Sequence, residues 1–232
     1  MNNFFEKYPE IYAVLSEKED GSMRMLEDRR NEENRKNFFR KNGINPDGVI
    51  SADLVHGNNI VIIEDDSLNV IKDTDGLVTS SKNISLSVTV SDCIPIFFFD
   101  PEKNIIAIAH AGWRGIVNDI IIKTIKKIKK LGSKEENIKV AVGPGINSCH
   151  FEIKEDVLNE FDNYKNFIIR REDGIFVDLK GIIKKQLEES GVRMDNIESD
   201  DECTYESEKY FSYRRDKPEV TEAMIAVIGF KK

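Results

Sequence analysis

The sequence predicts a single α+β domain in which layers of strand and helix share one hydrophobic core. Two observations lead to this prediction. Predicted strands and helices mix along the chain without the strict alternation that a parallel α/β sheet requires. No internal repeat, linker or low-complexity segment divides the 232 residues, a length that suffices for a sizeable core. We therefore expect one domain that spans residues 1–232.

The first third of the chain alternates between short strands and one charged helix. The predicted elements are a strand at 11–15, a helix at 28–42, strands on either side of a break at 56–59 within residues 49–63, a turn at 73–76 and a strand at 77–79. The helix ends at Gly43, a typical C-terminal cap. Gly57 lets the backbone turn so that the imidazole of His56 projects from a strand end.

Reactive side chains are concentrated in residues 86–115, LSVTVSDCIPIFFFDPEKNIIAIAHAGWRG. A predicted strand leads to Asp92 and Cys93, and an apolar run follows them. A second buried strand over 105–109 ends on His110. This segment thus holds a thiol, an imidazole, a carboxylate and a guanidinium, in a chain with only three histidines and three cysteines. We expect the functional site here.

The rest of the chain continues the mixed pattern. The predicted elements are an amphipathic helix at 116–130, a strand at 138–142, a helix at 153–163, a hairpin formed by 167–170 and 175–178, a helix at 179–190 and a final buried strand at 224–230. The strand at 138–142 runs into Gly143-Pro144-Gly145, where the glycines allow the backbone to approach a ligand closely.

Charge and cysteine usage exclude several classes of function. The net charge is −8 and the basic residues are spread among acidic ones, so we expect no nucleic-acid partner. No apolar run approaches the roughly 20 residues that span a bilayer, and the N-terminus does not resemble a signal peptide. Cys93, Cys149 and Cys203 are odd in number and far apart, which argues against a disulfide framework. A reduced, cytoplasmic protein is expected, and no feature sets an oligomeric state.

His56, Cys93 and His110 have the identities of a metal site with three protein ligands and one open position, the arrangement of catalytic zinc. Their spacing matches no zinc-finger pattern, so the fold has to bring them together. Two other interpretations stay open on the residues alone. In one, Cys93 is a thiolate nucleophile activated by either histidine. In the other, a buried cysteine and two hydrogen-bonded histidines serve only the structure.

Other polar residues are weaker candidates. Arg114 lies at the predicted N-terminus of a helix, where Gly112 to Gly115 present free backbone N–H groups that favour an anion such as phosphate. Asn34 and Arg35 lie on the predicted helix 28–42, and their spacing alone indicates a solvated face. His150 is interpreted as a surface or structural histidine in preference to a partner of the metal site.

Two runs, VSDCIPIFFFD and AHAGWRG, resemble the signature of the laccase-domain family. Members of this family were once described as multicopper polyphenol oxidases and are now described as purine nucleoside phosphorylases with adenosine deaminase activity. The resemblance covers about residues 30–230, and further matching segments are Asn34-Arg35, Val55-His56-Gly57, Asp75 to Thr79, Val142 to Ile146, Phe151-Glu152-Ile153 and Ser212 to Asp216. The fold that the resemblance implies is a layered sandwich of mixed β-sheets flanked by helices.

The resemblance also implies roles for individual residues. The zinc ligands are His56, Cys93 and His110, and Cys93 is also counted as catalytic together with Asp92, a candidate general acid or base. The residues expected to bind substrate or phosphate are Arg215, Arg114, Asn34 and Arg35. One cavity that contains these groups could hold a nucleoside beside an arginine clamp for phosphate.

Three segments depart from the family pattern. Residues 15–22 read LSEKEDGS where the family has a Thr-Thr-Arg-x-Gly-Gly loop, with Lys18 near the position of its arginine. Leu54 replaces the glutamine before Val-His-Gly, and Thr221-Glu222-Ala223 replaces Thr-Gly-Arg. The loss of an amide and a cation is expected to change substrate choice rather than metal binding.

These roles predict a zinc-dependent purine nucleoside phosphorylase that acts on adenosine and inosine, with nucleoside and phosphate as its small-molecule partners. Methylthioadenosine is a further candidate substrate and adenosine deamination a further candidate reaction. Zinc is expected ahead of copper, since multicopper oxidation needs many more histidines than three. The alternatives are a copper-dependent polyphenol oxidase, an amidohydrolase that edits peptidoglycan precursors through Cys93, and a non-catalytic protein whose metal orders a ligand pocket.

Overall fold

The computed structural model describes residues 2–24 and 29–231, which form two six-stranded sheets and one three-stranded sheet. Sheet 1 has the order β1 (Asn2–Phe4), β2 (Ile11–Leu15), β15 (Met224–Phe230), β7 (Ser85–Val90), β3 (Val49–Ala52), β5 (Val70–Ile71). Sheet 2 has the order β14 (Ile197–Ser199), β10 (Lys139–Val142), β8 (Ile94–Asp100), β9 (Ile105–Ala111), β6 (Gly76–Thr79), β4 (Ile60–Ile62). Sheet 3 has the order β11 (Glu152–Ile153), β13 (Gly174–Val177), β12 (Ile168–Arg171). Sheets 1 and 2 are both mixed, since each contains parallel and antiparallel neighbours.

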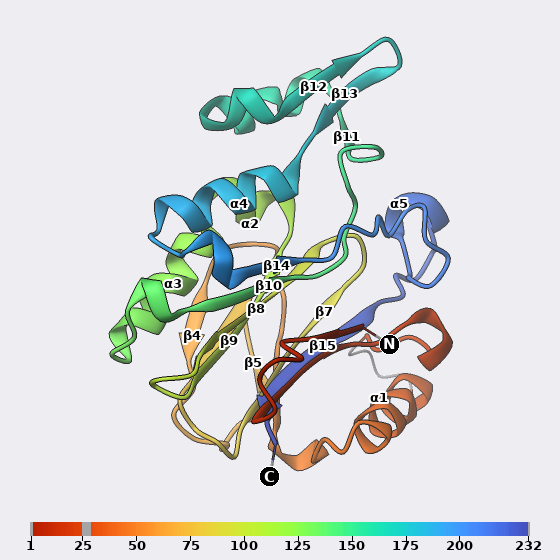
Figure 1. Cartoon of the computed structure of the whole chain (residues 1–232). Coiled ribbons are helices and arrows are strands. Elements are labelled where there is room, and N and C mark those ends of the chain that lie inside the picture. The colour runs from red at the N-terminus through yellow and green to blue at the C-terminus, as the bar shows by residue number, and fades with distance from the viewer. Residues whose placement is uncertain (1, 25–28, 232) are drawn as a thin grey trace.

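Helices cover the outer faces of the two large sheets (Figure 1). The α-helices are α1 (Arg29–Lys41), α2 (Trp113–Val117), α3 (Ile120–Lys130), α4 (Leu179–Glu189) and α5 (Tyr213–Asp216). Short 3₁₀ segments occur at Lys18–Asp20, Pro46–Gly48, Glu135–Asn137, Glu155–Phe167 and Met194–Asn196. Helix α1 packs on sheet 1, and helices α2, α3 and α4 lie beyond sheet 2 (Figure 1). The predicted α+β class, with mixed sheets flanked by helices, is confirmed.

The strands of sheet 2 are apolar on both faces because each face packs on a different layer. On β8, Phe97 and Phe99 belong to the core shared with sheet 1, whereas Ile96 and Phe98 belong to the core shared with the helices. Successive side chains of a strand point to opposite faces, so a continuous apolar run is what a central layer requires. Helix α3 completes the second core with its apolar stripe, which includes Ile125.

Two predicted elements are divided in the structure. The strand before Asp92 and the apolar run after it lie in different sheets, because the chain crosses from β7 in sheet 1 to β8 in sheet 2 at Asp92, whose φ is 73°. The predicted helix 116–130 is broken into α2 and α3 at Asp119, whose φ is 66°. Aspartate is one of the few residues that adopt this left-handed conformation readily.

Two other predicted helices lie close to elements of the structure. The predicted helix 28–42 is α1, and residue 28 lies outside the described residues. The predicted helix 153–163 is a 3₁₀ segment, Glu155–Phe167, interrupted by non-helical backbone at Phe161. The described helices include none that is long and apolar enough to cross a bilayer.

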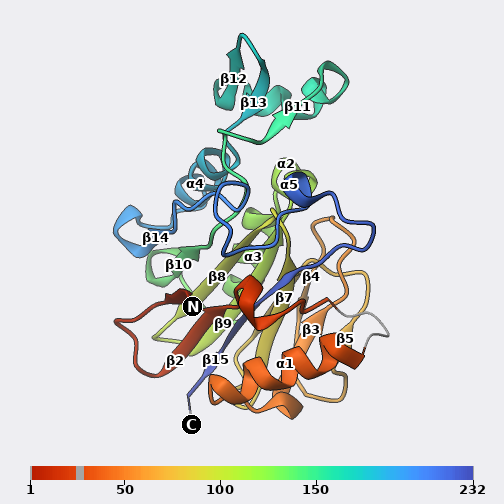
Figure 2. The same cartoon turned by 90° about the vertical axis from the view of Figure 1, so that its right-hand side faces the viewer.

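The segments that carry Asp92, Cys93 and His110 meet at one edge of the two large sheets. The pairing of Ile94 with Ala111 and of Pro95 with His110 places the start of β8 beside the end of β9. The crossing at Asp92 reaches the same edge from β7. Sheet 3 and helix α5 lie beyond this edge (Figure 2).

Candidate metal centre

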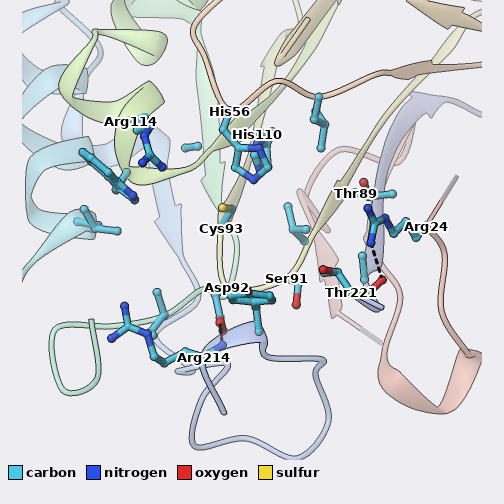
Figure 3. Close-up of a pocket in the computed structure, with 18 of the residues that line it drawn as sticks. Arg24, His56, Thr89, Ser91, Asp92, Cys93, His110, Arg114, Arg214 and Thr221 are labelled. Carbon is cyan, nitrogen blue, oxygen red and sulfur yellow. Dashed lines mark hydrogen bonds between the residues drawn. The ribbon is translucent and has the colours of Figure 1, made fainter. Parts of the chain in front are cut away.

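Three side chains that are distant in sequence meet at this edge. One nitrogen each of His56 and His110 and the sulfur of Cys93 all lie within 4.8 Å of one another. The two imidazole rings are 4.8 Å apart between centroids and nearly perpendicular. In Figure 3 both rings lie directly beside the Cys93 sulfur. The fold therefore brings together the three residues that were predicted as metal ligands.

Each of the three is positioned by a different local feature. His110 lies in β9 and is buried, with 2% of its surface exposed. Cys93 follows the crossing at Asp92 and is half-buried. His56 is exposed and has a φ of 57°, a left-handed conformation that turns its ring back toward the other two.

A fully buried carboxylate, Asp75, orients both histidines. Its Oδ1 accepts hydrogen bonds from the backbone N–H of His56 (2.8 Å) and from Nδ1 of His110 (3.2 Å). Its Oδ2 accepts one from the N–H of Gly57 (2.7 Å). Burial alone would raise the pKa of Asp75, but these hydrogen bonds lower it overall. With Nδ1 of His110 donating to Asp75, Nε2 is the ring nitrogen left for a metal.

The protonation of Cys93 and His110 also suits metal binding. Burial would raise the pKa of Cys93, but the charge of His110 and hydrogen bonds from both imidazoles lower it to about 6. Burial would lower the pKa of His110, but Cys93 and Asp75 raise it to about 9. The metal-free pair is thus a thiolate beside an imidazolium at neutral pH. A thiolate is the form of cysteine that binds metals.

Gly112 leaves the space that a metal at this site requires. A Cβ added to Gly112 would lie 3.1 Å from the Cys93 sulfur and 3.6 Å from ring carbons of His56 and His110. No other type of residue would leave the three donors open on this side. The donor set, the orienting carboxylate and the space at Gly112 together fit a metal with three protein ligands and one open position.

Replacing Gly112 by alanine is therefore expected to weaken Zn²⁺ binding by about tenfold, or about 1.4 kcal/mol. The new methyl group presses on the Cys93 sulfur and fills the space beside both imidazole rings, while the backbone of Gly112 (φ −74°, ψ 161°) accepts any residue. Zinc affinity is measured by competition with a chromophoric chelator. An unchanged affinity together with an unchanged melting temperature would show that this space is not used by the metal.

A cavity of about 810 Å³ opens over the three side chains. Its wall includes three arginines, Arg24, Arg114 and Arg214 (Figure 3). Within the described part of the chain, the Arg114 guanidinium makes no hydrogen bond or ion pair, and it lies 4.3 Å from the centre of the Trp113 ring. Arg114 follows Gly112 by two residues, so the predicted anion-binding arginine lies beside the candidate metal centre.

Asp92 also lines the cavity, and its carboxylate braces the C-terminal segment. Its Oδ1 accepts a hydrogen bond from the Thr204 hydroxyl (2.7 Å), and its Oδ2 accepts one from the backbone N–H of Arg214 (2.7 Å). These bonds fix the start of α5 over the cavity. The general acid or base role of Asp92 stays a prediction.

The guanidinium of Arg215, which was predicted to bind phosphate, is engaged by the protein itself. Nη1 donates to the carbonyls of Thr204, Tyr205 and Ser207, and Nη2 donates to the carbonyl of Tyr210. Nε and Nη2 also donate to Asp216. Arg215 is not part of the described cavity wall. It holds the loop before α5 together, and its phosphate contact stays a prediction.

Asn34 and Arg35 are likewise outside the described wall of the cavity. Asn34 donates to the carbonyl of Ser22 (3.0 Å), and Arg35 donates to the carbonyl of Met23 and the hydroxyl of Ser51 (2.8 Å each). Burial lowers the pKa of Arg35 to about 10, so it stays charged at neutral pH. Both residues hold the segment that leads to Arg24, and the substrate contact predicted for this pair stays a prediction.

The departures from the family pattern fall largely on the cavity wall. Leu54, Thr221 and Ala223 line it, and Lys18 lies elsewhere, above the Phe211 ring. Arg24 brings a cation to this side of the cavity and donates to the carbonyl of Thr221 (3.3 Å; Figure 3). Ala223 stands where the family pattern has an arginine, and Arg24 brings a positive charge to the same side of the cavity.

Sequence reasoning missed four residues of the site: Asp75, Arg24, Arg214 and Tyr213. Asp75 and Tyr213 lie inside segments that were quoted for the family resemblance, so those segments held a usable signal. Arg24 carried none. His150 does not join the first metal group and lies in a second cluster with Cys149 and Cys203.

Comparison with known proteins places this site in a family. A family model described as multi-copper polyphenol oxidoreductase laccase matches residues 23–231. A purine nucleoside phosphorylase of Corynebacterium glutamicum is 33% identical over 178 residues, which are 75% of this chain and 72% of that protein. A purine nucleoside phosphorylase of Deinococcus radiodurans is 33% identical over 202 residues, which are 86% of this chain and 77% of that protein.

Solved structures share the whole fold. The YlmD protein of Geobacillus stearothermophilus superposes with a TM-score of 0.91 at 25% identity, over 98% of this chain and 94% of that one. The hypothetical protein YfiH of Bacillus licheniformis superposes with a TM-score of 0.89 at 25% identity, over 99% of both chains.

Proposed function

The chain belongs to the multi-copper polyphenol oxidoreductase laccase family, and from this premise we propose that it is a zinc-dependent purine nucleoside phosphorylase. Relatives at 33% identity carry the name purine nucleoside phosphorylase. The observation that carries the proposal is one cavity that combines the His56, Cys93 and His110 group with Arg114, an arginine beside it. The cavity would hold the nucleoside, and the positive charge of Arg114 would bind the phosphate.

Zinc is the metal we propose for the Cys-His₂ group. Thiolate and imidazole ligands suit zinc, and a zinc ion with one open position would supply a Lewis acid that polarises a bound substrate atom or water. Multicopper oxidation would require many more histidines than the three in the sequence. We therefore propose zinc rather than copper, in spite of the description of the family.

The arginines are proposed to bind phosphate and to direct it at the nucleoside. Arg114 provides two parallel N–H donors for a pair of phosphate oxygens. Arg24 lies on the opposite side of the three metal-site side chains, and Arg214 lies beside Asp92 (Figure 3). Because these cations surround the cavity, they attract the phosphate dianion and lower its repulsion from polar groups of the substrate.

The remaining wall of the cavity is suited to a purine base and a ribose. Its volume of about 810 Å³ falls within the usual range of small-molecule sites. The 54%-exposed Tyr213 offers an aromatic face for stacking, whereas the Trp113 ring already packs on Phe161 and Arg114. Leu54 and Ala223 make this wall more apolar than the family pattern, which favours a base with few polar substituents, such as those of adenosine and methylthioadenosine.

Phosphorolysis then needs one bond to form and one to break. A phosphate oxygen forms a bond to the ribose C1′, the C1′–N9 bond breaks, and the purine leaves with the electron pair and takes up a proton. Asp92 is proposed to donate this proton, because it lines the cavity and a protonated carboxyl group can act as a general acid. Adenosine deamination, in which water replaces the 6-amino group and ammonia leaves, is proposed as a second reaction of the same cavity.

Adenosine tests both reactions in one incubation. Zinc-loaded protein is incubated with adenosine and phosphate, and the products are separated by liquid chromatography. Phosphate-dependent release of adenine supports phosphorolysis, and inosine supports deamination. If adenosine, and inosine in a parallel incubation, are both unchanged at every phosphate concentration, the proposal is wrong and the peptidoglycan-precursor alternative has to be tested.

A pair of arginine variants separates phosphate binding from support of the fold. Arg114→Gln is expected to raise the KM for phosphate about tenfold, since a charge-assisted hydrogen bond contributes about 1.5 kcal/mol or more, and to leave the melting temperature unchanged. Arg215→Gln is expected to reduce the free energy of unfolding by about 2–4 kcal/mol, because four backbone carbonyls lose their donor. Steady-state kinetics and thermal unfolding of both variants check this. The reverse pattern would restore the original assignment of Arg215.

The proposed setting is the cytoplasm. All three cysteines are free thiols, as expected in a reducing compartment. The net charge of −8 gives no electrostatic reason for binding nucleic acid, so the proposed partners are a nucleoside and phosphate.

A further inference from the structure

A second group of metal-binding side chains lies outside the proposed active site. One ligand atom each of Cys149, His150 and Cys203 lie within 4.8 Å of one another, and the group shares no residue with the first. Cys149 and His150 follow β10, and Cys203 follows β14, so two separate loops meet here. A fourth potential ligand, Glu206, has its Oε1 3.6 Å from Nδ1 of His150.

The distances are close to those of a tetrahedral zinc site. Zn–S bonds of about 2.3 Å and Zn–N bonds of about 2.0 Å at tetrahedral angles put sulfur and nitrogen about 3.5 Å apart, and nitrogen and oxygen about 3.3 Å apart. The Cys203 sulfur lies 4.0 Å from Nδ1 of His150, and Glu206 lies 3.6 Å from the same nitrogen. Closure of these two distances by about half an ångström, with a side-chain movement of Glu206, whose carboxylate is not among the atoms that all lie within 4.8 Å of one another, would complete the geometry.

The surroundings hold the ligands in place. The His150 ring stacks on Tyr205, with 4.0 Å between ring centroids and an angle of 16° between planes. The backbone N–H of Asn147 donates to the Cys203 sulfur (3.4 Å), which fixes the position of this side chain. Cys203 is 4% exposed, so its sulfur is screened from solvent. These contacts orient a soft donor and an imidazole toward one point.

The donor atoms of the cluster also suit a divalent cation. Two thiols and a carboxylate face a single imidazole. The neighbouring arginines, Arg171 and Arg214, direct their guanidinium groups to the carbonyls of Ser148, Cys149, His150 and Glu152. Two sulfurs, one imidazole and one carboxylate are a donor set that suits a divalent ion with a preference for sulfur and nitrogen.

We propose that Cys149, His150, Cys203 and Glu206 form a second, structural Zn²⁺ site. Four protein ligands leave no open position, which is the pattern of structural rather than catalytic zinc. A single β-bridge between Gly145 and Cys203 already joins the two loops. The metal would link the same two loops a second time. Thr204, the next residue, holds Asp92 through its hydroxyl, so the second metal would stiffen the loop behind the candidate active site.

Metal counting tests this proposal independently of any catalytic activity. Protein purified under reducing conditions is loaded with Zn²⁺, freed of excess ion and analysed by mass spectrometry of the metal. The wild type is expected to hold two equivalents, Cys149→Ser and Cys93→Ser one each, and the double variant none. Ser148→Ala, a neighbouring change that removes no ligand, should keep both. His150→Gln provides a second variant, also expected to hold one, in case Cys149→Ser does not fold.

Two further readouts identify the ligands. Co²⁺ bound to Cys93→Ser should show thiolate-to-cobalt charge-transfer absorption that Cys149→Ser/Cys93→Ser lacks. Loss of the second zinc should lower the melting temperature, since ligand binding to the native state stabilises it. The proposal is overturned if the reduced wild type holds a single equivalent that Cys93→Ser removes, or if the second equivalent survives in both Cys149→Ser and His150→Gln.

Discussion

Cys93→Ser is expected to abolish zinc binding at the candidate active site and to reduce phosphorolysis by about a thousandfold or more. A serine hydroxyl does not ionise near neutral pH, so it cannot replace the thiolate that lies within 4.8 Å of both histidine nitrogens. A catalytic metal contributes several kcal/mol to transition-state stabilisation, and about 4 kcal/mol corresponds to a factor of a thousand. Steady-state kinetics with inosine and phosphate measure the loss.

A ligand role for Cys93 must be distinguished from a nucleophilic one. Cys93→Asp keeps an oxygen ligand for zinc but no thiol, so it should retain part of the metal and part of the activity if Cys93 is a ligand. His56→Ala keeps the thiol but removes a ligand, so it should lose both. Full activity in metal-free His56→Ala would contradict the metal site and support nucleophilic catalysis by Cys93.

Asp75→Asn is expected to weaken zinc binding by about 10- to 100-fold, although Asp75 touches no metal. Three N–H donors, from His56, Gly57 and His110, converge on this one carboxylate. An amide has only one oxygen, so no orientation of asparagine can accept all three. In one orientation the amide NH₂ faces the N–H of Gly57, and in the other it faces the donors of His56 and His110, so that the His110 proton has to move from Nδ1 to Nε2, which removes the lone pair that binds the metal.

Asp73→Asn is the matched control for this variant. Asp73 lies two residues away, is exposed and has a φ of 52°, a backbone conformation that asparagine also tolerates. Its zinc affinity, measured by chelator competition, should equal that of the wild type. Equal affinities for Asp75→Asn and Asp73→Asn would show that Asp75 only supports the turn and does not set the tautomer of His110.

The sequence predicted several buried strands and the residues of the candidate metal centre. The apolar run of β8 and the start of β9 predicted buried strands, and reactive residues at strand ends predicted a site at a sheet edge. What periodicity cannot show is which sheet a strand joins. The change of sheet at Asp92 depends on one left-handed residue, and no pattern of apolar residues reports it.

The roles of the arginines were also beyond the sequence. Arg214 and Arg215 are adjacent in the Ser-Tyr-Arg-Arg-Asp segment and chemically identical. Arg215 turns toward the carbonyls of its own loop, whereas Arg214 lines the cavity and donates to the carbonyls of His150 and Glu152 in another segment. Only the three-dimensional course of the loop decides between them. For the same reason, the meeting of Cys149 and His150 with Cys203, more than 50 residues away, could not be predicted.

The most direct test of the proposed function is to identify the phosphorylated product. Inosine and inorganic phosphate are incubated with the zinc-loaded protein, and the reaction is followed by ³¹P nuclear magnetic resonance while hypoxanthine is quantified in parallel. We predict ribose 1-phosphate in amounts equal to hypoxanthine, and neither product with Cys93→Ser. Hypoxanthine accompanied by free ribose, or no hypoxanthine at all, would contradict phosphorolysis at this site.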